Sequence, residues 1–167
     1  TYDQIYGQFR LNAGTSDFIV GFLSFAEDKL VVFNRNSIHL ISGTSDPTTA
    51  TSQLITGEVG CVARKTITKI GDNIMFLSDN GLYSLSFQDL YNLRGDDLPV
   101  STDIESTINR INKAYASNAL GVYFENKYYL AVPLDDATVN SSIIIYNFLI
   151  SKVECINSIQ EMMMSML

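Results

Sequence analysis

The sequence repeats a pattern of short strands and tight turns at an interval of 44 residues, from Leu30 to Ile74. Residues 30–33 (LVVF) align with residues 74–77 (IMFL), and residues 38–41 (IHLI) align with residues 82–85 (LYSL). These runs are rich in β-branched and aromatic residues and are separated by Asn, Asp and Gly, which is typical of strands joined by hairpin turns. The repeat therefore predicts consecutive small antiparallel sheets.

A looser third copy of the pattern begins at Leu120 and ends at Ile156, interrupted by a polar loop at residues 135–142. Repeats of about 40 to 50 residues that contain several short strands are typical of β-propeller blades. We therefore predict a mostly β fold with a single β-propeller-like region over residues 1–167. Its blade-like units lie at about residues 18–44, 65–88 and 119–157.

The apolar period changes between the second and third copies. Ile104, Ile108, Ile111 and Tyr115 follow one another at helical spacing, and residues 102–105 (TDIE) have the spacing of a capping box. The pattern predicts one inserted amphipathic helix at about residues 102–116. The preceding residues 95–99 (GDDLP) have the composition of a linker.

Three blade-like units do not close a propeller, because closed propellers have about four to eight blades and an open arc exposes edge strands. The first residue is Thr1, and the sequence ends in the apolar residues 161–167 (EMMMSML). We expect the sequence to be a fragment of a longer polypeptide, or its blades to be completed by other segments.

Composition and charge exclude several classes of function. Apolar residues make up 46% of the sequence, which excludes a disordered chain. The 11 basic and 18 acidic residues give a net charge of -7, so the basic footprint of a nucleic-acid-binding protein is absent. No apolar run approaches the length of about 18 to 20 residues that a membrane span needs. Only 17% of residues are charged, against about 25% in average proteins, which indicates surfaces covered by protein partners.

The residues that usually support catalysis or bind metals are scarce. His39 is the only histidine, so a Ser/His/Asp triad or a multi-histidine metal site would have to be built on it, and we predict an ordinary strand residue instead. Cys61 and Cys155 have no CxxC partner and are expected to be reduced and buried. Nucleotide-binding and nucleophile-elbow motifs are absent. We predict no enzymatic activity and no cofactor.

Aspartates in turns are the remaining candidates for chemistry, because a glycosidase needs two carboxylates and leaves no local sequence pattern. Turn positions favour Asp for its side-chain hydrogen bonds to the backbone, and this structural role is the preferred interpretation. The five aspartates are Asp28, Asp72, Asp79, Asp135 and Asp136.

Three tyrosines offer a second feature of carbohydrate binding, a stacking platform for sugars. Tyr123, Tyr128 and Tyr129 are close in the third copy, but Tyr128 and Tyr129 alternate faces on one strand. Packing in the core is the commoner fate of such residues. A carbohydrate-binding or glycan-cleaving β-propeller is therefore kept as the alternative hypothesis.

The long polar loop of the third copy is the candidate site for contact with partner proteins. Its candidate contact residues are Asp135, Asp136 and Asn140. Residues 140–142 (NSS) also form a glycosylation sequon, but the sequence shows no secretory signal, so we interpret them as part of the loop.

Six segments carry a resemblance to a known family, and they are residues 30–39, 60–63, 71–85, 101–112, 126–133 and 143–147. Taken together and in this order, they resemble the propeller segments of the tail nozzle, or tail tubular, family of short-tailed bacteriophages. The resemblance covers about residues 18–156. One departure is that such blades often end in a strand Trp, where this sequence has Val153 and no Trp anywhere.

The resemblance implies a structural protein of the virion tail, assembled in the host cytoplasm. In this family six subunits form a ring below the portal, contact the tail adaptor and fibres, and let DNA pass during ejection without reading its sequence. An acidic chain suits this role, because a basic channel would bind the phosphate backbone and slow ejection. A cellular propeller scaffold remains a third hypothesis.

Overall fold

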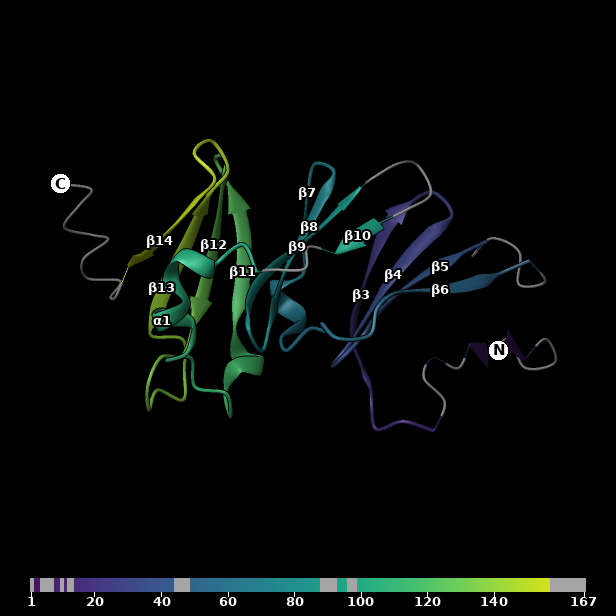
Figure 1. Ribbon diagram of the computed structural model, residues 1–167, viewed down its shortest axis with the longest axis horizontal. Helices are drawn as coiled ribbons and strands as arrows, with labels where there is room; N and C mark the ends of the chain where they lie inside the picture. The colour runs from purple at the N-terminus through teal and green to yellow at the C-terminus, as the bar shows by residue number, and fades with distance from the viewer. Residues whose placement is uncertain are drawn as a thin grey trace. The chain divides into compact units, whose positions relative to one another are not determined.

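The structure is a computed structural model that describes residues 2–3, 8–9, 11, 14–43, 49–87, 93–95 and 99–156. The chain divides into two compact units, residues 1–61 and residues 62–167. Three four-stranded antiparallel sheets contain most of the regular structure (Figure 1). The prediction of a mostly β fold is confirmed. Among the described residues, no helix is long and apolar enough to cross a membrane.

Sheet 1 belongs to the first unit and contains its strands in sequence order. These are β3 (Ile19–Ala26), β4 (Lys29–Asn34), β5 (Ile38–Ser42) and β6 (Thr51–Thr56). A separate two-stranded ladder joins β1 (Tyr2–Asp3) to β2 (Gln8–Phe9).

Sheet 2 is the second copy of the pattern and lies in the second unit, after a 3-10 turn at Arg64–Thr66. The repeat aligns β4 with β8 and β5 with β9, so equivalent runs form equivalent strands. The strands of sheet 2 are β7 (Thr68–Ile70), β8 (Asn73–Ser78), β9 (Gly81–Phe87) and β10 (Leu93–Gly95).

Sheet 3 is the looser third copy and is again an antiparallel meander. The turn between its first two strands places both Glu125 and Asn126 at positive φ, the conformation of the two-residue turns that suit the twist of a hairpin. The strands are β11 (Leu120–Phe124), β12 (Lys127–Val132), β13 (Ser142–Asn147) and β14 (Lys152–Ile156).

Sheets 1 and 2 each contain a fourth strand outside the units predicted from the sequence. The strand β6 has the sequence TSQLIT and is largely exposed, so it lacks the apolar run that marked the other strands. The strand β10 includes Gly95, which the composition assigned to a linker. Both are edge strands, where pairing to one neighbour suffices without a buried apolar face.

The inserted helix is shorter than the predicted span of residues 102–116. A 3-10 turn at Thr102–Ile104 leads into α1 (Glu105–Ile108), and a second 3-10 turn follows at Ala116–Asn118. The helix ends because Ile111 bridges to Leu134 and the Asn112 backbone N–H donates to the Pro133 carbonyl at 2.9 Å. The capping box does not form either: the Thr102 hydroxyl donates to the Pro99 carbonyl at 2.8 Å.

The core of the second unit lies between sheets 2 and 3. Tyr128 is fully buried there, and its hydroxyl donates to the Thr66 carbonyl at 2.6 Å. The inserted segment covers the same core with Ile108, Ile111 and Ala116. The strand residues of this core are Ile70, Met75, Leu77 and Leu82 from sheet 2 and Tyr128, Leu130, Val132 and Ile144 from sheet 3.

Candidate contact surfaces

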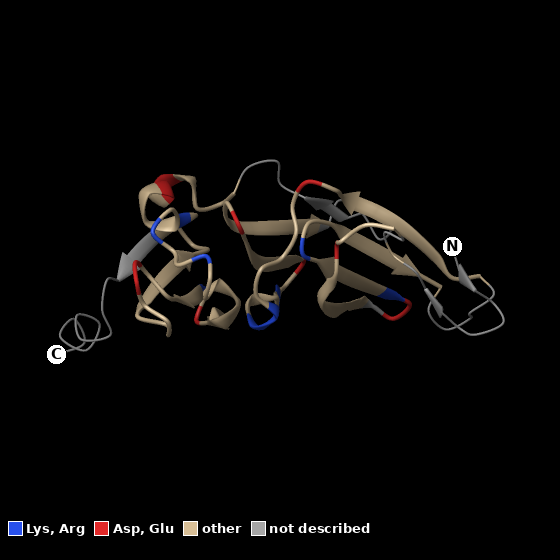
Figure 2. Cartoon of the chain, turned by 90° about the horizontal axis from the view of Figure 1, so that it is seen from below, with Lys and Arg blue, Asp and Glu red and all other residues tan. Residues whose placement is uncertain are grey.

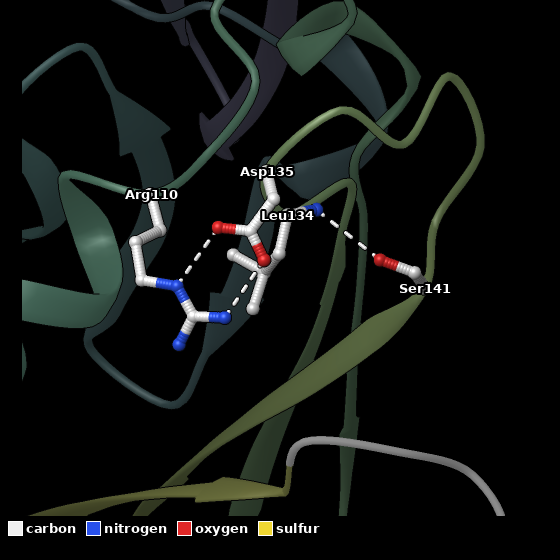
Figure 3. A network of polar contacts seen from close by, with 4 residues as sticks. All are labelled: Arg110, Leu134, Asp135 and Ser141. Atoms are coloured by element: carbon white, nitrogen blue, oxygen red, sulfur yellow. Dashed lines mark hydrogen bonds and ion pairs between the residues drawn. The ribbon is translucent and has the colours of Figure 1, made fainter.

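The predicted contact loop is hydrogen-bonded to the inserted segment at residues 102–118 of the same chain. The Arg110 guanidinium donates two hydrogen bonds to the Asp135 carboxylate, from Nε to Oδ1 at 2.9 Å and from Nη2 to Oδ2 at 2.7 Å (Figure 3). The Asp135 backbone N–H donates to the Arg110 carbonyl at 2.8 Å, and the Ser141 hydroxyl accepts from the Leu134 N–H at 3.2 Å. The carboxylate of Asp135 therefore orders the loop from within.

Asparagine side chains make further connections between the loop and the inserted segment. The Asn112 amide donates to the Ala137 carbonyl at 3.1 Å, and the Asn118 amide donates to the Thr138 carbonyl at 3.2 Å. In the opposite direction, Asn140 donates to the Asn118 carbonyl at 2.9 Å. Of the three predicted contact residues, Asp135 and Asn140 thus serve internal bonds, while Asp136 is exposed.

The pKa of Asp135 lies below its ordinary value, first because of the hydrogen bonds from Arg110 and then because of the positive charge of that guanidinium. A carboxylate with a depressed pKa keeps its favourable pairing above its ordinary pKa and loses it as the pH falls. The substitution Arg110→Gln is expected to raise the pKa of Asp135 toward the ordinary value. Carbon-detected NMR titration of the Asp135 carboxyl measures this change.

The matched control is Arg64→Gln, because Arg64 is an exposed arginine on the 3-10 turn at Arg64–Thr66. The Asp135 titration should be unchanged in this variant. An unchanged titration in Arg110→Gln as well would contradict the assignment of Arg110 as the main cause.

The outer face of sheet 3 is the second candidate surface. The inner face contacts sheet 2, whereas the outer face exposes Leu120, Val122 and Phe124 of the edge strand β11, with 48%, 54% and 59% of their area accessible. Two rows of paired residues cross this face. The first is Leu120, Ala131 and Ile143, and the second is Val122, Tyr129 and Ile145.

These rows carry no charged residue in β11, β12 and β13, but β14 continues the second row with Glu154 opposite Ile145. Lys127 and Lys152 lie in the next row at one end. Figure 2 shows that charged residues of the described part lie mainly in turns and near strand ends. Water-exposed sheet faces normally alternate with polar residues, and contiguous apolar patches mark interaction sites. Ile145 in the second row is only 5% exposed, so it is the β11 edge of the outer face, with Leu120, Val122 and Phe124, that has the chemistry of a protein contact surface. In the sequence, this surface is indicated only by apolar residues that point to both faces of the sheet in β12 and β13.

His39, the only histidine, lies in a buried polar network of the first unit. The Ser37 hydroxyl donates to the Asp17 carboxylate at 2.6 Å, and its oxygen lies 3.4 Å from Nε2 of His39. The Asn34 amide donates to the same hydroxyl at 3.0 Å. In a catalytic triad the imidazole lies between the serine and the carboxylate. Here the serine lies between the other two, so this network lacks the order that activates a nucleophile.

Burial lowers the pKa of His39 below its ordinary value, and the Asp17 carboxylate opposes this shift more weakly. Above pH 6.5 the imidazole is neutral in both the folded and the unfolded chain. Below it the unfolded chain binds the proton more readily, so the free energy of unfolding should fall as the pH decreases from about 6.5 to 5.5. Urea unfolding at these pH values measures the slope.

The substitution His39→Gln should remove the imidazole's contribution to the pH dependence of the free energy of unfolding. Carboxylates contribute equally in both proteins, so the difference between the two slopes is due to His39. Equal slopes in the two proteins would contradict the assignment.

The three tyrosines considered for a sugar-stacking platform do not share one exposed face. Tyr128 is buried in the core, and Tyr129 lies on the opposite face of β12, as the alternation of strand side chains predicts. Tyr123 is partly exposed and donates to the Asn126 side chain at 3.2 Å. The described residues contain no group of three or more His, Cys, Asp or Glu placed to hold a metal ion. Cys61 is buried, as expected, and the side chain of Cys155 lies outside the described residues.

No protein-family model matches the sequence, and no curated protein matches it. A function is therefore inferred from two features, the outer face of sheet 3 and the loop whose Asp135 binds Arg110.

Proposed function

We propose that this protein is a non-enzymatic structural component of a bacteriophage tail, of the nozzle type. In this proposal the three sheets are consecutive blades of a β-propeller, and the chain forms part of the conduit through which DNA leaves the particle. The observation that carries it is the exposed apolar face of sheet 3, which a protein working alone in water would cover or make polar.

The hydrogen bonds between the loop at residues 133–141 and the inserted segment support the same role. Its carbonyls and its Asp135 carboxylate bind Asn112, Asn118 and Arg110, so little ordering entropy remains to be lost when a partner binds. Asp136 and Val139 stay exposed on this fixed frame. The low charged fraction of 17% also agrees with a surface that neighbouring subunits cover.

Quantitative mass spectrometry of purified phage particles tests the proposal. We expect this protein at a fixed ratio to the portal protein, with about six copies per particle for a hexameric ring. The variant Val122→Glu should fold and yet be lost from particles, because it places an unpaired charge in the contact. Leu149→Glu is the matched control, since Leu149 is 75% exposed in the turn before β14. Absence of the unmodified protein from particles would overturn the proposal.

The loop is tested separately by replacing residues 135–141 with a short Gly-Ser link, which leaves Ser142 in β13. Reduced incorporation into particles, with the fold retained by circular dichroism, is the expected result. Normal incorporation and normal infectivity would show that the loop contacts no partner, and the role of the outer face of sheet 3 would stand on its own test.

A further inference from the structure

We infer that one end of sheet 3 binds the surface of a lipid bilayer that contains anionic lipids. The binding element consists of the two neighbouring turns at residues 124–127 and 147–152, which we call the tip of sheet 3. This inference goes beyond the proposed function and does not depend on it, because it concerns a lipid surface and not a protein of the particle.

The two turns of the tip are joined into one unit, and both lie at the same end of sheet 3 (Figure 1). The Phe148 backbone N–H, in the turn between β13 and β14, donates to the Asn126 carbonyl of the turn between β11 and β12 at 3.0 Å. The rings of Tyr123 and Phe148 meet edge to face, with 5.8 Å between their centroids. The Leu149 N–H donates to the Asn147 side chain at 3.0 Å. These contacts hold the side chains of the tip in a defined arrangement.

Bulky apolar side chains are displayed at the end of the tip. Phe148 packs on the core of the second unit, whereas its neighbours Leu149 and Ile150 are 75% and 53% exposed. Ser151 follows them with a φ of 49°, a left-handed conformation that is uncommon for a residue other than Gly. Turns normally place small polar residues or Gly at such positions. The display of Leu149 and Ile150 on a strained backbone therefore indicates a function for these side chains.

Positive charge lies directly behind the apolar end. The last row of paired residues before the turns contains Phe124, Lys127, Asn147 and Lys152. Glu125 is the one acidic residue in the sequence of the two turns, so two lysines outweigh one glutamate here, while the whole chain has a net charge of -7. Lysine side chains have long aliphatic stems that let the ammonium group reach anionic headgroups while the neighbouring apolar groups are buried.

Tyrosines follow in the next row of the sheet. Tyr123 and Tyr146 belong to this row, and Tyr123 is partly exposed. Tyrosine is enriched where the hydrocarbon of a membrane meets the headgroups, because its ring is apolar and its hydroxyl is wet. From its end inward, the tip therefore presents apolar groups first and cationic and phenolic groups behind them, which matches hydrocarbon followed by headgroups.

A bilayer suits this tip better than a folded protein does. A stable protein contact buries about 800 Å² and about 20 to 30 residues on each partner, whereas the tip consists of two short turns. Apolar side chains on a turn enter the fluid boundary between headgroups and acyl chains without needing a complementary pocket. The strength of such binding increases with the apolar area buried and with attraction to anionic lipids.

Sedimentation of the purified chain with vesicles tests the inference. We expect binding to vesicles of phosphatidylcholine mixed with phosphatidylglycerol, and weaker binding to phosphatidylcholine alone. The double substitution Leu149→Glu with Ile150→Glu should lower the partition coefficient at least about tenfold, because charged side chains are costly in hydrocarbon. Lys152→Gln should lower binding to the mixed vesicles about fivefold and leave binding to phosphatidylcholine unchanged.

Val139 provides the matched control, because it is 68% exposed in the loop at the opposite end of sheet 3. Val139→Glu should bind the mixed vesicles like the unmodified chain, and circular dichroism should report native folding of all variants. A loss of binding in Val139→Glu equal to that in the double variant would overturn the assignment of the tip.

A fluorescent reporter locates the residue that enters the bilayer, because the sequence contains no Trp. The emission of Leu149→Trp should shift to the blue on addition of mixed vesicles and should be quenched by brominated acyl chains. Val139→Trp should keep its emission under the same conditions. An unshifted emission of Leu149→Trp, while the protein sediments with the vesicles, would show that the tip is not the part that contacts lipid.

A chain that binds neither kind of vesicle would also overturn the inference, and the exposed apolar residues of the tip would then need a protein partner. This result is distinguishable from failure of the proposed function, because Leu149→Glu is expected to enter particles normally. Incorporation into particles without vesicle binding removes the lipid contact alone, whereas vesicle binding without incorporation removes the tail function alone.

Discussion

The substitution Gly60→Ala is expected to lower the free energy of unfolding of the first unit by about 3 kcal/mol. A methyl group at this position would lie 2.3 Å from both the carbonyl carbon and the oxygen of Arg35, and 2.4 Å from the Asn36 nitrogen. These are backbone atoms, so no side-chain rotation relieves the overlap. Either the segment with Gly60 or the turn between β4 and β5 must move.

Movement of that turn is costly because its backbone N–H groups already donate hydrogen bonds. The Arg35 N–H donates to the Phe18 carbonyl at 2.9 Å, and the Asn36 N–H donates to the Asp17 carboxylate at 2.8 Å. The Cys61 N–H next to the glycine donates to the Asn34 carbonyl at 2.9 Å. The alanine variant should therefore weaken several hydrogen bonds of this turn together with the close packing.

Hydrogen exchange followed by mass spectrometry measures the loss and localises it, with faster exchange expected in residues 14–43. The matched control is Gly57→Ala, because a methyl group there meets only the Leu54 side chain at 3.7 Å, an ordinary contact. Its stability should stay within about 0.5 kcal/mol of the unmodified chain. Similar behaviour of the two variants would show that the approach of Gly60 to Arg35 does not constrain the fold.

The clearest sequence signal for a strand comes from strands in which buried residues point to both faces of the sheet. In β8 every residue from Ile74 to Ser78 is buried, and such strands appear in a sequence as unbroken apolar runs. The edge strand β6 carries no such signal, because its polar residues face water and only its backbone pairs with β5. The predicted units therefore contain the central strands and four of the edge strands, and they miss only the edge strands β6 and β10.

The inserted helix shows how a tertiary contact overrides a periodic pattern. Ile104, Ile108 and Ile111 all pack on the core as their spacing suggested, yet the backbone leaves the helix after Ile108. The groups that would continue it pair with residues 133–135, which lie far away in the sequence. Arg110 and Asp135 are also far apart in the sequence, so their ion pair cannot be predicted from a local pattern. Asp135 was therefore expected to be available to a partner.

The outer face of sheet 3 was missed for a different reason. An apolar strand residue gives the same sequence signal whether a neighbouring sheet covers it or not. Only the packing distinguishes Tyr128, which is covered by sheet 2, from Val122, which is half exposed. The function proposed for this protein depends on that distinction, since the exposed apolar residues indicate the surface where a partner belongs.

Tyr128 is the residue whose removal should most destabilise the second unit. The substitution Tyr128→Ala is expected to lower its free energy of unfolding by about 3 to 5 kcal/mol, because it leaves a large cavity between sheets 2 and 3. Tyr128→Phe keeps the ring and loses the hydrogen bond to the Thr66 carbonyl, so about 1 kcal/mol is expected. Urea unfolding with hydrogen exchange over residues 62–156 measures both.

The neighbouring tyrosine provides the matched control, because Tyr129 is adjacent in sequence and lies on the opposite face of the same strand. Tyr129→Ala should cost well under half as much stability as Tyr128→Ala while weakening the contact through the outer face. The two substitutions therefore separate the core from the contact surface within one strand. Equal losses of stability at the two positions would mean that the outer face is already covered within the chain, and the proposed contact would then have no surface to use.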